Sequence, residues 1–281
     1  MDIPPVLGTF LLVFFTTTLC RYVRSLLRRL LKDDINIYQY VAEVISTFQL
    51  VTGMVEGDTI LEEYGFYWYG LYLWVFFISL TLTFDGDSTA NACAVWHSML
   101  VRNCTRLTGI LKILLQIIGG QLAFPFVRFL WRFSPLAKHR AKRSSLVALH
   151  CQSALKVSIL EGCFAESLAT FLYFLIMVTL QPKGRIRNAV CDASVQVGII
   201  LIGLEWTGMM FNPALASALT FNCVNHPLLD HLLVYWVAPM ATIPIVQSSF
   251  GTIQRFQRQR RGGRIRAENG GTESEERLKE D

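Results

Sequence analysis

Two asparagines in apolar surroundings, Asn91 and Asn212, constrain the chemistry of this chain most strongly. Asn212 is followed by Pro213 and by the helix-compatible residues 214–219. An asparagine caps a helix by accepting a backbone N–H bond, and proline fits the first helical position. A helix that starts within an apolar segment directs the positive end of its dipole into the membrane, where irregular backbone is tolerated only inside protein or beside a wet cavity. These residues therefore indicate half of a pore.

A matching half precedes it in the chain. The segments Ala42–Phe48 and Ala165–Phe171 share the pattern Ala-Glu-x-x-small-Thr-Phe, and Asn91 precedes Asn212 at nearly the same spacing. Each copy then holds a helix with a glutamate, a second span, a half-helix and a third span. Because three spans per copy is an odd number, we expect the second copy to be inverted, as in transporters and channels built from inverted repeats.

Glu43 and Glu166 occupy equivalent positions in the predicted spans, where a carboxylate is costly and is usually functional or paired. A proton relay or a solvated helix end would explain one such residue. Their symmetric placement favours a structural role instead. We expect each carboxylate to accept hydrogen bonds from the non-helical backbone that leads into its half-helix.

The elements that must position these residues follow from the composition. Of the 281 residues, 52% are hydrophobic and 17% are charged, which is typical of a polytopic helical membrane protein. The spans predicted for the two repeats are 40–55, 66–84, 107–127, 157–180, 189–204 and 231–250. We expect a channel domain over 36–252, with repeats 36–130 and 157–252, and a disordered tail over 253–281.

Residues 1–35 are predicted to form an additional N-terminal helix. Residues 3–20 are apolar and long enough to span a membrane, and residues 21–32 form a basic flank. A signal peptide is the alternative, but the run starts with Asp2 rather than basic residues, and no small-residue cleavage site follows. We therefore expect a retained anchor.

Other residues that often carry chemistry form no recognisable set. The seven cysteines include no C-x-x-C pair and the five histidines are scattered, so no metal site or redox motif is indicated. There is no nucleophile set or phosphate-binding loop, and we expect neither a cofactor nor enzyme activity. The net charge of +5 comes from basic clusters that ordinarily flank membrane spans, so nucleic-acid binding is not expected.

The paired motifs resemble the two Asn-led boxes of the aquaporins. These boxes are Asn91-Ala92-Cys93 and Asn212-Pro213-Ala214. Cys223 follows Ala214 by nine residues, which resembles the signature of the unorthodox branch, the superaquaporins. Further similarity to the aquaporin-11 and aquaporin-12 branch is found at 85–86, 212–221 and 235–239, and the resemblance covers about residues 1–250.

This resemblance implies an all-α membrane protein: an aquaporin-like right-handed bundle of six transmembrane helices and two half-helices in inverted repeats, with an extra N-terminal helix. It also implies a homotetramer in the lipid bilayer. The implied function is a passive channel for water and small neutral solutes such as glycerol or hydrogen peroxide, with Asn91 and Asn212 facing a single file of solute. The alternative is a non-conducting scaffold that keeps the aquaporin fold.

Two departures from the family pattern bear on selectivity. Ala92 stands where most aquaporins have proline, so the φ restraint is lost while the Asn cap remains. Leu215 stands where water-selective members carry an arginine. Counted from the boxes, the filter positions are Leu71, Ile200, Met209 and Leu215. Such an apolar filter offers water few hydrogen-bond partners and no fixed cation.

The distribution of basic residues predicts the orientation. The segments 21–32, 183–187 and 255–266 all fall on the cytoplasmic side of a six-span core. The cluster 128–143 falls on the other side, either as an interfacial segment or because the span count is off by one; three clusters against one favour the first. The sequon at Asn103 then faces the cytoplasm and is predicted to stay unmodified.

The segment 255–266 also bears on the compartment. It holds Arg-x-Arg pairs, which favour retention in the endoplasmic reticulum, whereas a lipid-binding flank is the alternative. The family that the chain resembles is typically intracellular. We therefore expect a multi-pass protein of the endoplasmic reticulum or another intracellular membrane, with the plasma membrane as the alternative.

Overall fold

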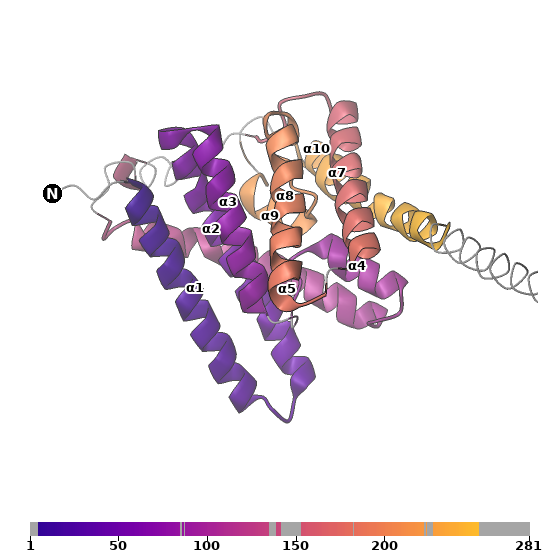
Figure 1. The fold of residues 1–281 in the computed structure, drawn as a ribbon, viewed down its shortest axis with the longest axis horizontal. Helices are drawn as coiled ribbons and strands as arrows, with labels where there is room; N and C mark the ends of the chain where they lie inside the picture. The colour runs from indigo at the N-terminus through magenta and orange to yellow at the C-terminus, as the bar shows by residue number, and fades with distance from the viewer. Residues whose placement is uncertain are drawn as a thin grey trace, which may run out of the picture.

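The computed structural model describes residues 5–134, 139–141 and 153–252, except positions 85, 87, 182, 222 and 224–226. Within these residues the chain forms helices and no strand, as predicted (Figure 1). The long helices are α1 (Pro5–Leu30), α2 (Ile35–Tyr64), α3 (Phe66–Phe84), α5 (Arg106–Leu130), α7 (Ile159–Leu180) and α8 (Arg185–Thr207). The last one, Leu228–Thr252, starts with α10 (Leu228–His231) and the π-helical η1 (Leu232–Val237). Two short helices are α4 (Ala92–Leu100) and α9 (Pro213–Leu219).

Six helices of the described chain are long and apolar enough to cross a membrane, which makes this a multi-pass membrane protein. They are α1, α3, α5, α7, α8 and Leu228–Thr252. Helix α2 is not among them, although it has 30 residues, and it extends past both ends of the predicted span 40–55. Its polar residues, including Glu43, Gln49 and Glu56, are buried among its neighbours. Helix α2 is therefore a largely buried helix, and its polar side chains that bond to neighbouring helices, such as Glu43 and Gln49, lower a hydropathy score without exposing charge to lipid.

Corresponding helices of the two halves have corresponding neighbours. Helix α2 packs against α3 and α5, and in the second half α7 packs against α8 and η1. Helices α3 and α8 pack against each other, and the short helices α4 and α9 also meet. The two short helices thus lie where the halves join.

Two adjacent glycines allow α5 to approach two helices at once. A Cβ atom on Gly119 would overlap the carbonyl oxygen of Val44 in α2. A Cβ atom on Gly120 would lie 3.0 Å from the Cβ of Ala218 in α9. This is the close helix contact that a pair of small residues favours within a membrane, and it seats α9 against the first half of the bundle.

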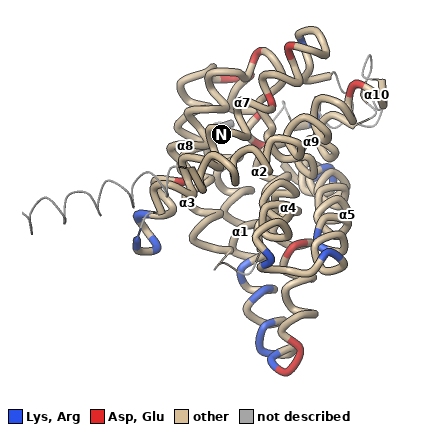
Figure 2. Tube along the Cα trace, turned by 90° about the vertical axis from the view of Figure 1, so that its right-hand side faces the viewer, with Lys and Arg blue, Asp and Glu red and all other residues tan. Residues whose placement is uncertain are grey.

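Helix α1 lies along α2 and touches α3, with many of its apolar side chains facing outwards (Figure 1). Its buried face repeats every three or four residues, as expected for one side of a helix. This face consists of Thr9, Val13, Thr16, Cys20 and Arg24. Figure 2 shows Lys and Arg gathered at the end where α1 turns into α2, but Arg24 is only 4% exposed. Arg24 is thus not one of the solvated charges of the basic flank.

Candidate functional site

Each of the two asparagines caps a short helix. The Oδ1 of Asn91 accepts a hydrogen bond of 2.8 Å from the backbone N–H of Cys93, at the start of α4. The Oδ1 of Asn212 accepts bonds of 3.2 and 3.4 Å from the N–H groups of Ala214 and Leu215, at the start of α9. Both caps have extended backbone, with φ of −142° and −147°. Cap chemistry therefore sets where both short helices begin.

The side-chain amides of the two caps reach across to the opposite half of the chain. The Nδ2 of Asn212 donates to the carbonyl oxygen of Ala90 over 2.7 Å, and the Nδ2 of Asn91 donates to that of Phe211 over 3.4 Å. Each bond ends on the residue that precedes the other cap. An amide NH₂ carries two donors, and each of these bonds uses one of them.

The residue before each cap has a left-handed backbone. Ala90 has φ of 48° and Phe211 has φ of 31°, where side chains other than glycine are disfavoured. Such a conformation costs about 1–3 kcal/mol and persists when surrounding contacts over-determine it. The crossed amide bonds are one such contact, because they bind the carbonyl groups of these same two residues.

Glu43 and Glu166 make the hydrogen bonds to the loops that the sequence led us to expect. The carboxylate of Glu43 accepts from the N–H groups of Thr89 and Ala90 at 3.1–3.2 Å. The carboxylate of Glu166 accepts from the N–H of Met210 at 3.0 Å and from that of Phe211 at 2.6 Å. Both glutamates have 0% exposure. Each carboxylate thus binds the N–H of the left-handed residue, Ala90 or Phe211, and the N–H of the residue before it.

The surroundings of the two glutamates differ. Glu43 also accepts 2.8 Å from the side-chain amide of Gln116, and the Nζ of Lys112 lies 4.0 Å away. Glu166 instead accepts 2.6 Å from the hydroxyl of Thr207, whose backbone carbonyl accepts from the hydroxyl of Tyr235. The first carboxylate therefore has a cation nearby, and the second is held by hydroxyl and backbone donors.

A cavity of about 570 Å³ reaches the two asparagines from one side of the bundle. Asn91 and Asn212 line it together with residues 88–90, and α3 and α8 form much of its wall. Its polar lining includes Thr81, Tyr173, Arg185, Asn188, Asp192 and Gln196. This cavity, called the polar chamber below, therefore extends to the point where the two short helices meet.

Asp192 is a polar group of this chamber that the sequence analysis did not identify. Its Oδ1 accepts 2.8 Å from the hydroxyl of Tyr173 and its Oδ2 accepts 2.8 Å from the hydroxyl of Thr81. The signal was present, because Asp192 lies inside a predicted span, and a charged residue there is usually functional or paired. The same reasoning that identified Glu43 and Glu166 applies to it.

The other residues of the two boxes are buried rather than exposed to this chamber. Ala92, Cys93 and Ala214 each have 0% exposure, and Pro213 is also buried. Cys93 is a free thiol that packs with Phe174 of α7. We therefore place only the asparagines of the two boxes at the cavity, and regard their neighbours as the first turns of the helices.

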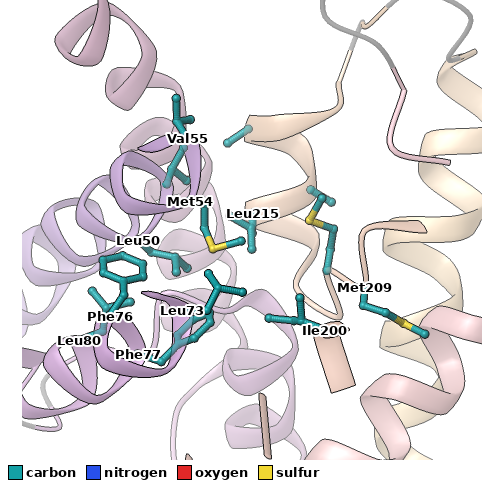
Figure 3. Packing of buried hydrophobic residues seen from close by; sticks show 14 of the residues in the cluster. Leu50, Met54, Val55, Leu73, Phe76, Phe77, Leu80, Ile200, Met209 and Leu215 are labelled. Carbon is teal, nitrogen blue, oxygen red and sulfur yellow. The ribbon is translucent and has the colours of Figure 1, made fainter. Parts of the chain in front are cut away.

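The four expected filter residues do not converge as the count from the boxes predicted. Ile200 and Leu215 are buried in one cluster, but Leu71 is 50% exposed on the outer face of α3. Leu73, with 0% exposure, belongs to that cluster, and Figure 3 shows it next to Leu215 and Ile200. Two residues correspond to about 200° around a helix, so this shift exchanges the outer face for the inner one. The structure therefore places Leu73, and not Leu71, in the buried cluster with Ile200 and Leu215.

Met209 also differs in direction from the other expected filter residues. It is 9% exposed, and its side chain fills the space beside Gly203 of α8. In Figure 3 it points away from the group formed by Leu73 and Leu215. Its backbone is left-handed, with φ of 47°, which turns the chain just after α8.

Cys223 lies beyond the C-terminal end of α9 and forms a disulfide bond. Its side chain is 6% exposed. Five other cysteines of the described chain are free thiols: Cys20, Cys93, Cys104, Cys163 and Cys191. Because disulfides persist in oxidising compartments, the disulfide of Cys223 is informative about the side of the membrane on which this residue lies.

The chain is similar in sequence to known proteins, although no protein-family model matches it. It is 30% identical over 169 residues to aquaporin-12 of Mus musculus, which covers 60% of this chain and 57% of that protein, a little over half of its length. It is 28% identical over 243 residues to aquaporin-11 of Milnesium tardigradum, which covers 85% of each. To aquaporin-11 of Homo sapiens it is 27% identical over 205 residues, or 72% and 73% of the two chains.

Proposed function

We propose that this chain, which is similar in sequence to aquaporin-11 and aquaporin-12, is a passive transmembrane channel for water and small neutral solutes. The observation that carries the proposal is the crossed pair of asparagines at the inner end of the polar cavity. Two capped half-helices meet there with their positive ends together. Glycerol and hydrogen peroxide are the further solutes we propose.

Neutral solutes are favoured by the way the asparagine amides are held. Each NH₂ group of Asn91 and Asn212 uses one donor on the opposite loop, so the second donor is available to a solute oxygen in the cavity. The N-terminal end of each short helix carries a partial positive charge of about half an elementary charge. These partial charges oppose the passage of cations, protons included, while uncharged oxygen acceptors bind well.

The width of the pore is set by apolar residues in this proposal. Leu73, Ile200 and Leu215 belong to one buried cluster, which we propose as the neck of the pore, and position 215 holds leucine rather than arginine. Apolar side chains offer a solute no hydrogen bonds to replace those that it makes with its hydration shell. Small uncharged solutes, which lose few hydrogen bonds to water when they enter in single file, are therefore favoured over ions.

The orientation follows from two independent features. The disulfide of Cys223 favours the lumenal or extracellular side for the end of α9. Arg185 and Asn188 line the cavity near the start of α8, and they belong to or follow the basic segment 183–187. We therefore place this end of the cavity and α4 on the cytoplasmic side.

We further propose that the protein is a homotetramer in an intracellular membrane, with the endoplasmic reticulum as the first candidate. The Arg-x-Arg pairs behind this proposal, and the tail 253–281 that contains them, lie outside the described residues. The domain scheme is likewise a proposal: an accessory helix in 1–35 and a channel over 36–252, with repeats 36–130 and 157–252.

A non-conducting scaffold is the alternative, and the apolar neck together with Ala92 in the first box favours it. Stopped-flow light scattering on proteoliposomes distinguishes the two. The channel proposal expects water and glycerol permeabilities above those of empty liposomes, with a loss of the excess in Asn212→Ala. Leu71→Ala is the matched control, because Leu71 faces outwards, and it should conduct as the wild type does. Wild-type permeability equal to that of empty liposomes would reject the channel.

A further inference from the structure

Arg24 is a buried cation on the extra helix α1, and it is hydrogen-bonded to the helix that holds the first box. Its Nη1 donates 3.1 Å to the hydroxyl of Ser46, and its Nη2 donates 2.7 Å to the side-chain carbonyl of Gln49. Both partners belong to α2. A buried charge inside a membrane protein is costly unless it is hydrogen-bonded, so this arrangement indicates a specific role.

The contacts continue from α2 to the loop in front of Asn91. The hydroxyl oxygens of Ser46 and Ser88 lie 2.5 Å apart and share a hydrogen bond. Ser88 lines the cavity and directly precedes Thr89 and Ala90, whose N–H groups bind Glu43. Arg24 is thus connected, through Ser46 and Ser88, to the segment that carries the first asparagine.

A second branch of the same network reaches the end of α3. The Nε2 of Gln49 lies 3.3 Å from the hydroxyl of Thr83 and 3.4 Å from that of Thr17 in α1. The guanidinium of Arg24 lies 5.3 Å from the ring centre of Phe84, the last residue of α3. The segment that leads to Asn91 begins just after Phe84, so Arg24 contacts the residue before this segment directly and reaches Ser88 within it through Ser46.

In the second half, a different set of contacts holds the loop before Asn212. Glu166 binds the N–H groups of Met210 and Phe211, and the hydroxyl of Thr207 accepts from the N–H of Met209. All of these groups belong to α7, to α8 or to the loop itself, and within the described residues no helix contributes to them as α1 does to the first half. The Arg24 network is therefore an addition to the symmetric design.

We propose that Arg24 is a positioning residue of the pore, and that α1 braces the segment 88–91 through the Arg24–Ser46–Ser88 connection. The left-handed Ala90 requires such over-determination, because its backbone is unfavourable on its own. Helix α1 is then part of the conducting structure rather than a separable anchor. The consequence for solute passage rests on the proposed channel function, but the brace itself does not.

Hydrogen exchange measured by mass spectrometry tests the brace on the purified full-length protein in nanodiscs. In Arg24→Met, amides of segment 86–93 should exchange about tenfold faster or more, since hydrogen bonds to a charged group are lost. Segment 207–214, which Glu166 holds, should exchange as in the wild type. Arg21→Met is the matched control, because Arg21 is an exposed arginine one turn earlier in α1. Unchanged exchange at 86–93, or equal acceleration of both segments, would overturn the proposal.

Ser88→Ala provides a second variant with a minimal change in volume, should Arg24→Met fold poorly. It removes the last link and leaves the bonds of Arg24 to Ser46 and Gln49 in place. We expect the same direction of local change at 86–93, and a smaller further acceleration when Arg24→Met is added than Arg24→Met causes alone, because the Ser46–Ser88 branch is already broken while the branch through Gln49 and Phe84 remains. Wild-type exchange in Ser88→Ala would contradict the brace.

The permeability ratio of glycerol to water in proteoliposomes reports on positioning, because a loss of folded protein lowers both values together. Arg24→Met and Ser88→Ala should each change this ratio severalfold, and Arg21→Met should leave it unchanged. An unchanged ratio in both variants would overturn the positioning role. If the wild type conducts neither solute, the proposed function fails, and the exchange experiment still decides whether the brace exists.

Discussion

The side-chain amide of Asn212 donates a hydrogen bond of 2.7 Å to the backbone carbonyl of Ala90, a residue of the opposite repeat. Asn91 returns the contact to Phe211 over 3.4 Å. Each capping side chain therefore has two tasks: it starts its own helix, and it holds the left-handed residue that starts the other one. The two halves of the site are interdependent at the level of single hydrogen bonds.

Replacement of Asn212 by alanine should lower both stability and conductance. The variant loses the cap of α9 and the bond to Ala90, which together correspond to about 1–3 kcal/mol. Thermal unfolding in detergent should show a lower midpoint, and water permeability should fall towards that of empty liposomes. Asn188→Ala, in the lining of the same cavity, is the control, and its free energy of unfolding should change by no more than about 0.5 kcal/mol. Equal midpoints for the two variants would contradict the role of Asn212.

Replacement of Glu166 by glutamine should destabilise the second half of the site. The new NH₂ group would face a backbone N–H of Met210 or Phe211, so one donor would lose its acceptor, at about 1–3 kcal/mol. Glu161→Gln in the same helix is the matched control, because Glu161 lies in an exposed capping box that glutamine also satisfies. The unfolding midpoint of Glu166→Gln should be the lower one; a similar midpoint for both would remove the structural role assigned to Glu166.

Leu73 and Leu71 should respond differently to replacement by alanine. Truncation of the fully buried Leu73 creates a cavity and should destabilise the protein by about 2–5 kcal/mol. It should also widen the neck and raise the permeability ratio of glycerol to water. Leu71→Ala changes an outward-facing side chain and should leave that ratio as it is. The reverse pattern, in which only Leu71→Ala changes the ratio, would restore the filter position counted from the boxes.

Proline at position 92 should be tolerated. The N–H of Ala92 donates only a long bond of 3.4 Å to the Oδ1 of Asn212, and position 92 is the first residue of α4, where proline fits. Asn91 before it is extended, as a residue that precedes proline should be. The stability lost with this long hydrogen bond and the stability gained because proline restricts the unfolded chain should nearly cancel, so the free energy of unfolding should change by no more than about 1 kcal/mol. A strongly lowered melting temperature would show that the Ala92 bond matters more than its length indicates.

The two short helices should report opposite sides of the membrane in cells. Asn103 lies beyond the C-terminal end of α4 and should remain unglycosylated, whereas Cys223 lies beyond the end of α9 on the oxidising side. A glycosidase gel-shift assay in eukaryotic cells measures this, with a sequon engineered next to Cys223 as the positive control. Modification of Asn103 would invert the proposed orientation.

The positions of the half-helices were predictable because cap chemistry is local and occurs twice. An asparagine before a short helix-compatible run specifies a start, and the repeated Ala-Glu pattern pairs each start with a glutamate. The bonds of Glu43 and Glu166 to the loops follow from that symmetry. These features depend on a few residues that are close in sequence or related by the repeat.

The inner face of α3 and the partners of Arg24 were not predictable in the same way. Leu71 and Leu73 are both leucines in a uniformly apolar helix, so no sequence pattern shows which of them faces the bundle, although a shift of two residues reverses the face. Arg24 stands among Arg21, Arg28 and Arg29, and only the packing of α1 on α2 distinguishes it from them. Burial that depends on a neighbouring helix leaves no trace in the order of the residues.

The crossed amide bonds also determine what becomes of an incomplete chain. A fragment that stops after the first repeat would hold the amide of Asn91 and the carbonyl of Ala90 in the bilayer without their partners. Unsatisfied groups of this kind cost several kcal/mol each in lipid. A chain that ends between Asn91 and Phe211 would therefore leave these groups unsatisfied, and the first repeat alone would not form a stable half of the pore.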